Sequence, residues 1–191
     1  YIGSDAFIGC PFTYNNYFEI PSSVLTIGPR AFVLCSFLRF IQIPSSVTSI
    51  GEHAFGGCSS LRAVKIDVSL TTIKSYTFYK CKSLESIELP KSITLIDSYA
   101  FYQCTSLKNI EIPPLTSSIG INAFAQCESL NEVILSPILE SICEFAFNCC
   151  KSLNSIDLPS FIKSIGDGAF SGCSSLNQII IPPSVKFIGS Y

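Results

Sequence analysis

The sequence predicts an α/β solenoid of about eight stacked coils, each built from one 23-residue unit. Four columns of residues recur along the 191-residue chain at this interval without a slip, which four independent columns do not do by chance. The columns are isoleucine (27, 50, 73, 96, 119, 142, 165 and 188), phenylalanine (32, 55, 78, 101, 124, 147 and 170), cysteine (35, 58, 81, 104, 127, 150 and 173) and leucine (38, 61, 84, 107, 130, 153 and 176). Because a unit this short cannot bury its apolar side alone, successive copies must stack on one another.

Each unit is expected to contain one short strand. In the clearest copy, Val64 and Ile66 are two residues apart and point to one side, whereas Lys65 points to the other. A proline follows the strand in most units and ends it, because proline has no N–H for a sheet ladder. These prolines are Pro21, Pro44, Pro90, Pro113, Pro159 and Pro182. Strands of successive coils should pair in parallel, about 4.8 Å apart, to form one extended sheet.

The rest of the unit predicts a short helical turn. Ile50, Ala54, Cys58 and Leu61 are spaced by four, four and three residues, which places them on one face of a helix-like turn. A glycine precedes this turn in five units, as Gly51 does here, and permits a tight bend.

Both ends of the chain depart from the repeat. Two extra residues lie between Cys10 and Phe18, so the irregular first unit, 1–20, is expected to bulge as a loop. The last unit, 181–191, is partial. We therefore interpret 1–191 as a single repeat array taken from a longer one, whose uncapped ends are expected to permit end-to-end self-association.

Composition excludes several classes of partner. The net charge is −2 and only 14% of the residues are charged, so no cluster of Lys and Arg is available to bind nucleic acid. Hydrophobic residues make up 48%, yet no stretch approaches the roughly 18 apolar residues of a membrane span. We expect neither nucleic-acid binding nor membrane insertion of this segment.

Eight of the ten cysteines, Cys10 among them, fall in one column and predict a file of small buried thiols. Their Cβ vectors run parallel, which disfavours disulfides between neighbours, and a linear file does not converge on a metal ion. Cys143 and Cys149 lie off this column, Cys149 directly before Cys150. Two incidental, partly exposed thiols are the simplest interpretation; a local bridge, an intermolecular bond and redox sensitivity are the alternatives.

Catalytic machinery is not evident. A serine or cysteine nucleophile needs a nearby base, and the single histidine, His53, stands at a variable position that we expect to face solvent. The glycines recur with the coil instead of clustering around a phosphate, and nothing tunes Glu88 and Glu111 into an acid and a base. We expect no enzyme and no cofactor.

The outer face of the predicted sheet is one candidate binding surface. It runs from a basic patch (Arg39, Arg62, Lys65) through an acidic middle (Glu85, Glu88, Glu111, Glu132) to apolar points at Ile134 and Ile180. An ordinary solvated sheet accounts for this pattern. The alternative is a polar recognition face with Phe40 and Ile134 as apolar anchors, because interface energy concentrates in a few such groups.

Four tyrosines form the other candidate surface. Tyr76 and Tyr99 are one period apart, as are Tyr79 and Tyr102, so the four side chains should cluster on adjacent coils. They are expected either to stack on one another and shield the coils or to form an aromatic platform for a glycan or protein partner.

The pattern Leu-x-x-Ile-x-Ile-Pro followed by Ile-Gly-x-x-Ala-Phe-x-x-Cys resembles the BspA-like leucine-rich repeat family, found in surface proteins of bacteria and protozoa. Departures are few: Thr77 replaces the alanine, Cys143 the glycine, and Asp67 and Ser136 the proline. The resemblance implies a right-handed coil with a parallel sheet on the concave face and short helical turns and loops on the other side. It also implies non-enzymatic adhesion at the cell surface or as a secreted protein.

Taken together, these features favour a binding or adhesion module that presents an extended surface to a protein or glycan. A structural spacer and an intracellular interaction scaffold without a ligand of its own are the alternatives.

Overall fold

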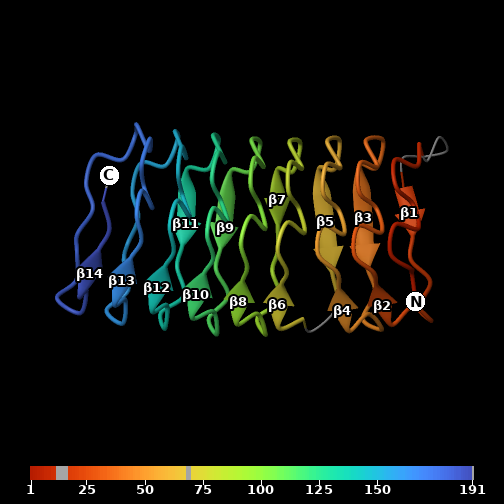
Figure 1. Ribbon diagram of the computed structural model, residues 1–191, viewed down its shortest axis with the longest axis horizontal. Coiled ribbons are helices and arrows are strands. Elements are labelled where there is room, and N and C mark those ends of the chain that lie inside the picture. Colours follow the sequence, from red (N-terminus) through yellow and green to blue (C-terminus); the bar gives the residue numbers. More distant parts are fainter. Residues whose placement is uncertain (12–16, 68–69, 191) are drawn as a thin grey trace.

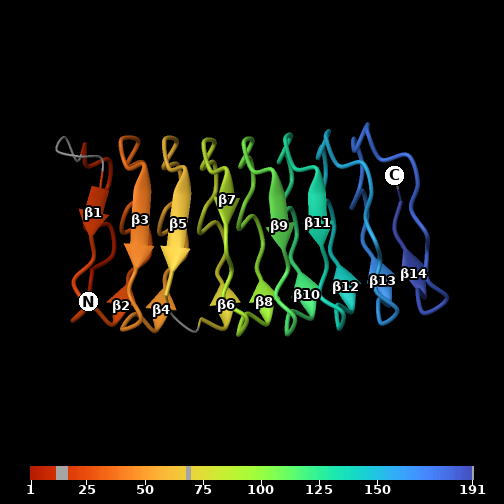
Figure 2. The same ribbon diagram turned by 180° about the vertical axis from the view of Figure 1, so that it is seen from behind.

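Short parallel strands stack coil upon coil along the chain (Figures 1 and 2). The computed structural model describes residues 1–11, 17–67 and 70–190. The strands fall into two layers at different places around the coil. The first layer contains β1 (Tyr17–Glu19), β3 (Phe40–Ile43), β5 (Ala63–Ile66), β7 (Ser86–Ile87), β9 (Asn109–Glu111) and β11 (Glu132–Ile134). The second contains β2 (Thr26–Ile27), β4 (Ser49–Ile50), β6 (Thr72–Ile73), β8 (Leu95–Ile96), β10 (Ser118–Ile119), β12 (Ser141–Ile142), β13 (Ser164–Ile165) and β14 (Phe187–Ile188).

Neighbouring strands pair in parallel and are offset by one repeat. Ile41 lies opposite Val64 in the first layer, and Ile142 lies opposite Ile165 in the second. The predicted parallel sheet is therefore confirmed as the first layer, and the second layer is an addition to it. Among the described strands, pairing is interrupted between β7 and β9 and between β4 and β6.

The chain makes about seven turns, and the predicted eight coils are not confirmed. The eight second-layer strands enclose seven complete periods, because Ile27 and Ile188 are separated by seven intervals of 23 residues. The loop predicted in the first unit falls largely on residues 12–16, which lie outside the described part of the chain.

The predicted helical turns are wrong: within the described residues the segments between the strands are turns, and none is a helix. An α-helix needs each amide to bond the carbonyl four residues earlier. Here alternate amides donate instead to the next coil, at carbonyls 22 residues later: those of His53, Phe55 and Gly57. The amides between them donate within the coil, three residues back: those of Ala54, Gly56 and Cys58.

Left-handed backbone interrupts each turn segment twice. One column of positive φ contains Arg30, His53, Tyr76, Tyr99, Asn122, Phe145 and Gly168. A second column, four residues later, contains Leu34, Gly57, Lys80, Gln103, Gln126, Cys149 and Gly172. A right-handed helix cannot continue through such residues, and non-glycine residues adopt this conformation at a cost of about 1 kcal/mol. The apolar spacing that suggested a helix still holds, because Ile50, Ala54, Cys58 and Leu61 are all buried.

A file of stacked phenylalanine rings fills the core. Phe32, Phe55, Phe78, Phe101, Phe124 and Phe147 have no solvent exposure. From Phe32 to Phe170, each ring lies on the next with centroids 5.1–5.6 Å apart and planes within 18° of parallel. Each coil thus covers the aromatic side chain of its neighbour, and the predicted common core is confirmed.

The cysteine column is also buried and hydrogen-bonded. Each thiol from Cys35 to Cys173 donates to the carbonyl of a phenylalanine in the preceding coil, over 2.9–3.2 Å. Burial raises the pKa of Cys127 to about 12 and that of Cys173 to about 11. All ten cysteines are free, so the predicted column without disulfides is confirmed; seven of its eight thiols are buried as predicted, and Cys10 is half-buried.

Removing one ring from the file should destabilise the solenoid strongly. We expect Phe101→Ala to lower the free energy of unfolding by about 3–5 kcal/mol, because it leaves a cavity between two fully buried neighbours. Urea unfolding followed by circular dichroism measures this loss. A variant that unfolds at the wild-type midpoint would contradict the stacked core.

The left-handed positions give a second stability prediction. Gly172 has a φ of 73°, and an added Cβ would lie 2.8 Å from the Sγ atom of Cys149. We expect Gly172→Ala to cost about 1–2 kcal/mol. Ser171→Ala is the matched control and should change stability by less than about 0.5 kcal/mol. Equal effects of the two substitutions in thermal or urea unfolding would show that the left-handed turn does not constrain the fold.

Candidate binding surface

The outer side of the first layer carries the polar residues predicted to form a recognition face. Strands β9 and β11 alternate exposed, buried and exposed residues, so Glu111 and Ile134 point outward while Ile110 and Val133 face the core. Glu111 lies directly opposite Ile134 in the parallel register. The structure therefore places Glu111 and Ile134 side by side on the outer face, one on each of two adjacent coils.

The basic end of this face is partly neutralised. Lys65 is 3.3 Å from Asp67, whose carboxylate also accepts a hydrogen bond from the side-chain amide of Gln42. The hydrogen bond from Gln42, followed by the contacts with Lys65, lowers the pKa of Asp67. Arg39 and Arg62 are exposed on adjacent coils, and Phe40 is half-buried beside them.

The acidic middle has no such partners. Four ion pairs occur among the described residues: Arg30–Asp5, Lys65–Asp67, Lys151–Glu128 and Lys163–Glu140. None of them includes Glu85, Glu88, Glu111 or Glu132, which are all exposed. These four carboxylates therefore form no ion pair within the described part of the chain.

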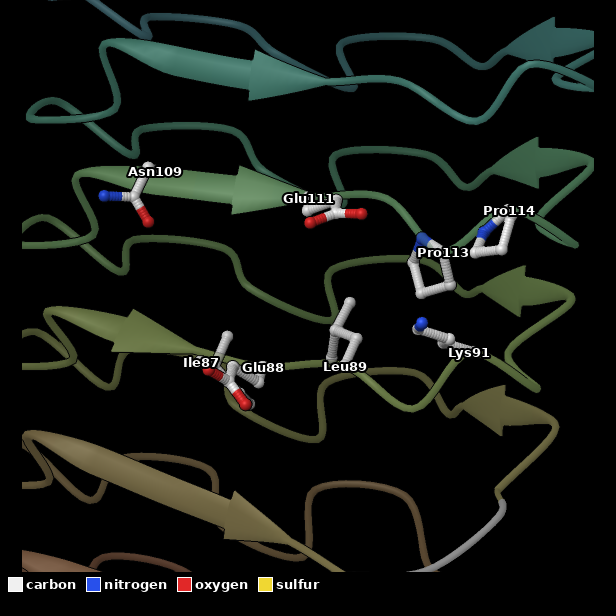
Figure 3. Close-up of a pocket in the computed structure, with 8 residues that line it drawn as sticks. All are labelled: Ile87, Glu88, Leu89, Lys91, Asn109, Glu111, Pro113 and Pro114. Atoms are coloured by element: carbon white, nitrogen blue, oxygen red, sulfur yellow. The ribbon is translucent and has the colours of Figure 1, made fainter.

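A hollow lies within this acidic stretch, where the first layer is interrupted between β7 and β9 (Figure 3). Its volume is about 410 Å³, within the range of small binding sites. Glu88 and Glu111 come from the two flanking coils, and Ile87, Leu89, Pro113 and Pro114 supply an apolar lining. Asn109 and Lys91 complete it, so two carboxylates stand against one ammonium group.

The four tyrosines form two face-to-face stacks, one beside the other. The ring centroids are 4.8 Å apart between Tyr76 and Tyr99 and 5.3 Å apart between Tyr79 and Tyr102. Tyr76 meets Tyr79 edge to face. The predicted cluster is confirmed, and one face of each tyrosine ring is covered by the ring stacked on it. Its use as a platform for a partner stays a prediction.

The expectation that His53 simply faces solvent is wrong. Its ring extends the tyrosine stack, parallel to Tyr76 at 4.3 Å and edge-on to Tyr79 at 5.9 Å. The partial burial that results lowers the pKa of His53. The signal was present in the sequence, since His53 lies one period before Tyr76.

The two cysteines outside the column are half-buried and free. The hydroxyl of Ser118 lies 4.0 Å from the sulfur of Cys143. Within the described part of the chain, no group of three or more histidine, cysteine, aspartate or glutamate residues is arranged to hold a metal ion. The same residues include no helix with the length and hydrophobicity needed to cross a membrane.

Sequence reasoning missed one exposed apolar row. Leu115, Ile138 and Phe161 follow one another at intervals of 23 residues and are 53%, 42% and 60% exposed. They could have been found by comparing the residues at the equivalent position of each unit, because the other described units carry serine there.

A family model described as BspA type Leucine rich repeat region matches the chain in six copies, over residues 1–115 and 94–191. Among solved structures, a leucine-rich repeat protein from Bacteroides ovatus is 37% identical, with a TM-score of 0.87 over 91% of this chain and 47% of that one. A leucine rich cell surface protein from Faecalibacterium prausnitzii is 32% identical, with a TM-score of 0.79 over 92% of this chain and 48% of that one.

The leucine-rich repeat protein of T. pallidum is likewise 32% identical, with a TM-score of 0.64 over 91% of this chain and 72% of that one. The chain thus spans about half the length of the first two of these structures. No curated protein sequence matches it.

The thiol environments predict which cysteines react. In the folded protein we expect only the half-buried Cys10, Cys143 and Cys149 to react readily with a thiol reagent such as DTNB, because the other seven thiols are buried and the reagent cannot reach them. All ten should react after denaturation in guanidinium chloride. Rapid reaction of more than three thiols in the native protein would contradict the buried column.

Proposed function

We propose that this chain, which belongs to the BspA-type leucine-rich repeat family, is a non-enzymatic binding module for a protein or glycan partner. The partner would bind the outer face of the first layer. The observation that carries this proposal is the hollow between β7 and β9, where the exposed Glu88 and Glu111 have no ion-pair partner in the described part of the chain. A packed scaffold alone does not require such a hollow.

The chemistry of the hollow favours a partner that carries positive charge. Two carboxylates stand beside an apolar lining of leucine, isoleucine and proline, which suits the aliphatic stem and cationic head of a lysine or arginine side chain. Arg39 and Arg62 sit on earlier coils of the same face and would meet acidic or polar groups of the partner. Complementary charge of this kind sets orientation and the rate of association.

The apolar anchors on this face are separate from its charges. Ile134 is 53% exposed, one coil beyond Glu111. Phe40 lies on β3, among the residues that line a second, smaller hollow with Lys65 and Glu88. Contact with these two side chains would supply desolvation energy, which charge complementarity alone does not provide.

The tyrosine stacks support a glycan less directly than a protein. A sugar ring usually needs an open aromatic face, whereas Tyr76 and Tyr99 cover one face of each other. Their edges and hydroxyl groups remain as contact points, since all four rings are only half-buried. A glycan would then be recognised by hydrogen bonds to tyrosine hydroxyl groups.

We further propose a location at the cell surface or in the secreted fraction, where binding modules of this architecture would meet their partners. The similar Faecalibacterium prausnitzii chain is described as a cell surface protein, and this supports the proposal. A structural spacer is the second candidate, favoured by the unbroken stacking of phenylalanine rings from Phe32 to Phe170, which would make a stiff rod. An intracellular scaffold would agree with the ten free thiols.

Charge reversal tests the binding proposal. The wild-type protein and the double variant Glu88→Lys/Glu111→Lys are applied to a glycan array and to a protein microarray that includes basic proteins. We expect a ligand retained by the wild type to bind the variant at least tenfold more weakly, because attraction becomes repulsion at the hollow. Affinity for the wild type should also fall as salt concentration rises.

Glu52→Lys is the matched control, since Glu52 is an exposed glutamate on the turn segments, away from this face. It should leave binding unchanged. Equal binding by wild type and double variant, or no retained ligand on either array, would contradict the proposed face and favour the spacer.

A further inference from the structure

Three apolar side chains stand exposed in a line at the turn that follows the first layer. Leu115, Ile138 and Phe161 occupy the same position of three successive coils, and we call them the apolar ridge. The other described coils carry serine at this position: Ser23, Ser46, Ser92 and Ser184. The ridge is therefore a local departure from the repeat, confined to adjacent coils.

In two of these coils the serine hydroxyl bonds the preceding coil, whereas the hydroxyl of Ser184 is buried without a hydrogen-bond partner in the described part of the chain. The Ser46 hydroxyl donates to the carbonyl of Val24 over 2.8 Å, and the Ser92 hydroxyl donates to the carbonyl of Leu70 over 2.6 Å. These bonds join one coil to the preceding one, and an apolar side chain cannot make them. In the coil of Leu115, the hydroxyl of the adjacent Thr116 makes a corresponding bond to the Ile93 carbonyl.

The ridge residues bring no compensating burial inside the molecule, because roughly half of each side chain is in contact with solvent. Exposed apolar residues are common singly, but a contiguous row of them usually marks a contact surface. A departure from the repeat rule without an internal gain points to contact with something outside the chain.

Charge differs between the two flanks of the ridge. On one flank, Pro113 and Pro114 lead directly into the acidic hollow of Glu88 and Glu111. On the other flank, Lys163 neutralises Glu140 over 2.9 Å. A partner lying on the ridge would thus meet excess negative charge on one side only.

We propose that the apolar ridge docks one amphipathic α-helix of a protein partner, oriented along the solenoid axis, with basic residues on the flank that faces the hollow. Ridge side chains repeat once per coil, about every 4.8 Å. One face of a helix presents a side chain about every 5.4 Å, so its side chains move out of register with the ridge by only about 1 Å over the three coils. Alternate residues of an extended strand repeat every 6.4–6.8 Å and would drift by more than 3 Å.

A second copy of this chain fits the ridge less well. Three half-exposed side chains offer on the order of a few hundred Å² of apolar area, whereas a stable dimer buries about 800 Å² per partner. A helix, by contrast, binds through a few anchors at i, i+3 or i+4, and i+7. The apolar contact in this inference does not rest on the proposed function, because the ridge lies outside the hollow; only the charged flank shares Glu88 and Glu111 with it.

The test uses a phage-displayed library of helical peptides about 15 residues long, or four turns. Peptides are selected on the wild-type protein and then measured on the triple variant Leu115→Ser/Ile138→Ser/Phe161→Ser. This variant restores the residue of the sister coils and should melt as the wild type does. Leu25→Thr is the matched control, since Leu25 is 59% exposed in a coil outside the ridge and threonine follows it in the next unit.

We expect the enriched peptides to carry apolar residues at helical spacing and lysine or arginine along one flank. Their affinity should fall at least tenfold on the triple serine variant and remain unchanged on Leu25→Thr. Glu88→Lys/Glu111→Lys should weaken binding of the peptides with basic flanks. If the charge-reversal variant binds these peptides as the wild type does, while the triple serine variant binds them weakly, the ridge is the helix site and the proposed charged flank is wrong.

Three results would overturn the inference. One is the absence of any enriched peptide whose binding depends on the ridge. Another is enrichment of sequences with strictly alternating apolar residues, which would indicate an extended occupant. The third is wild-type self-association in analytical ultracentrifugation that the serine variant abolishes, which would make a second copy of this chain the occupant.

Discussion

The division of backbone amides between a coil and its neighbours is the constraint on which the rest of this structure depends. In each turn segment, alternate amides bond the next coil and the remainder close short turns within the coil, as those of Phe55 and Cys58 do. A helix would keep all these bonds to itself and leave the coils joined only at the strands. Because the inter-coil bonds join residues at a fixed offset, each unit is held to the same length as its neighbours.

Stacking of like on like follows from that fixed length. Any residue lies over the residue 23 positions away, so a column of phenylalanine becomes a file of parallel rings. The same rule governs the surface: Lys151 pairs with Glu128 and Lys163 with Glu140, each one period away. Cysteine suits its column because its side chain is small enough to pack there and its thiol donates a hydrogen bond to a backbone carbonyl. An alanine in the same place would pack, but its methyl group could not donate this bond.

Periodicity made the core and the tyrosine cluster predictable, because both depend only on which residues share a column. It did not make the local backbone predictable. The spacing of Ile50, Ala54, Cys58 and Leu61 suits a helix face, and the same four residues are buried by a chain of turns. The choice between a helix and a chain of turns depends on which carbonyls accept from the backbone amides. The spacing of apolar residues contains no information about these hydrogen bonds. The second layer was missed for a related reason, since each of its strands is only two residues long.

Departures from a column are of two kinds in this structure. At the position of Tyr76 the residues vary along the array, but His53, Tyr76 and Tyr99 satisfy one another by stacking, so the variation is absorbed within the molecule. At the position of Phe161 the departure replaces serine, whose hydroxyl bonds the preceding coil at Ser46 and Ser92, with a ring that is 60% exposed. In a repeat protein the scaffold fixes most positions, so an exposed apolar departure on its surface is the observation that favours the proposal of an external partner.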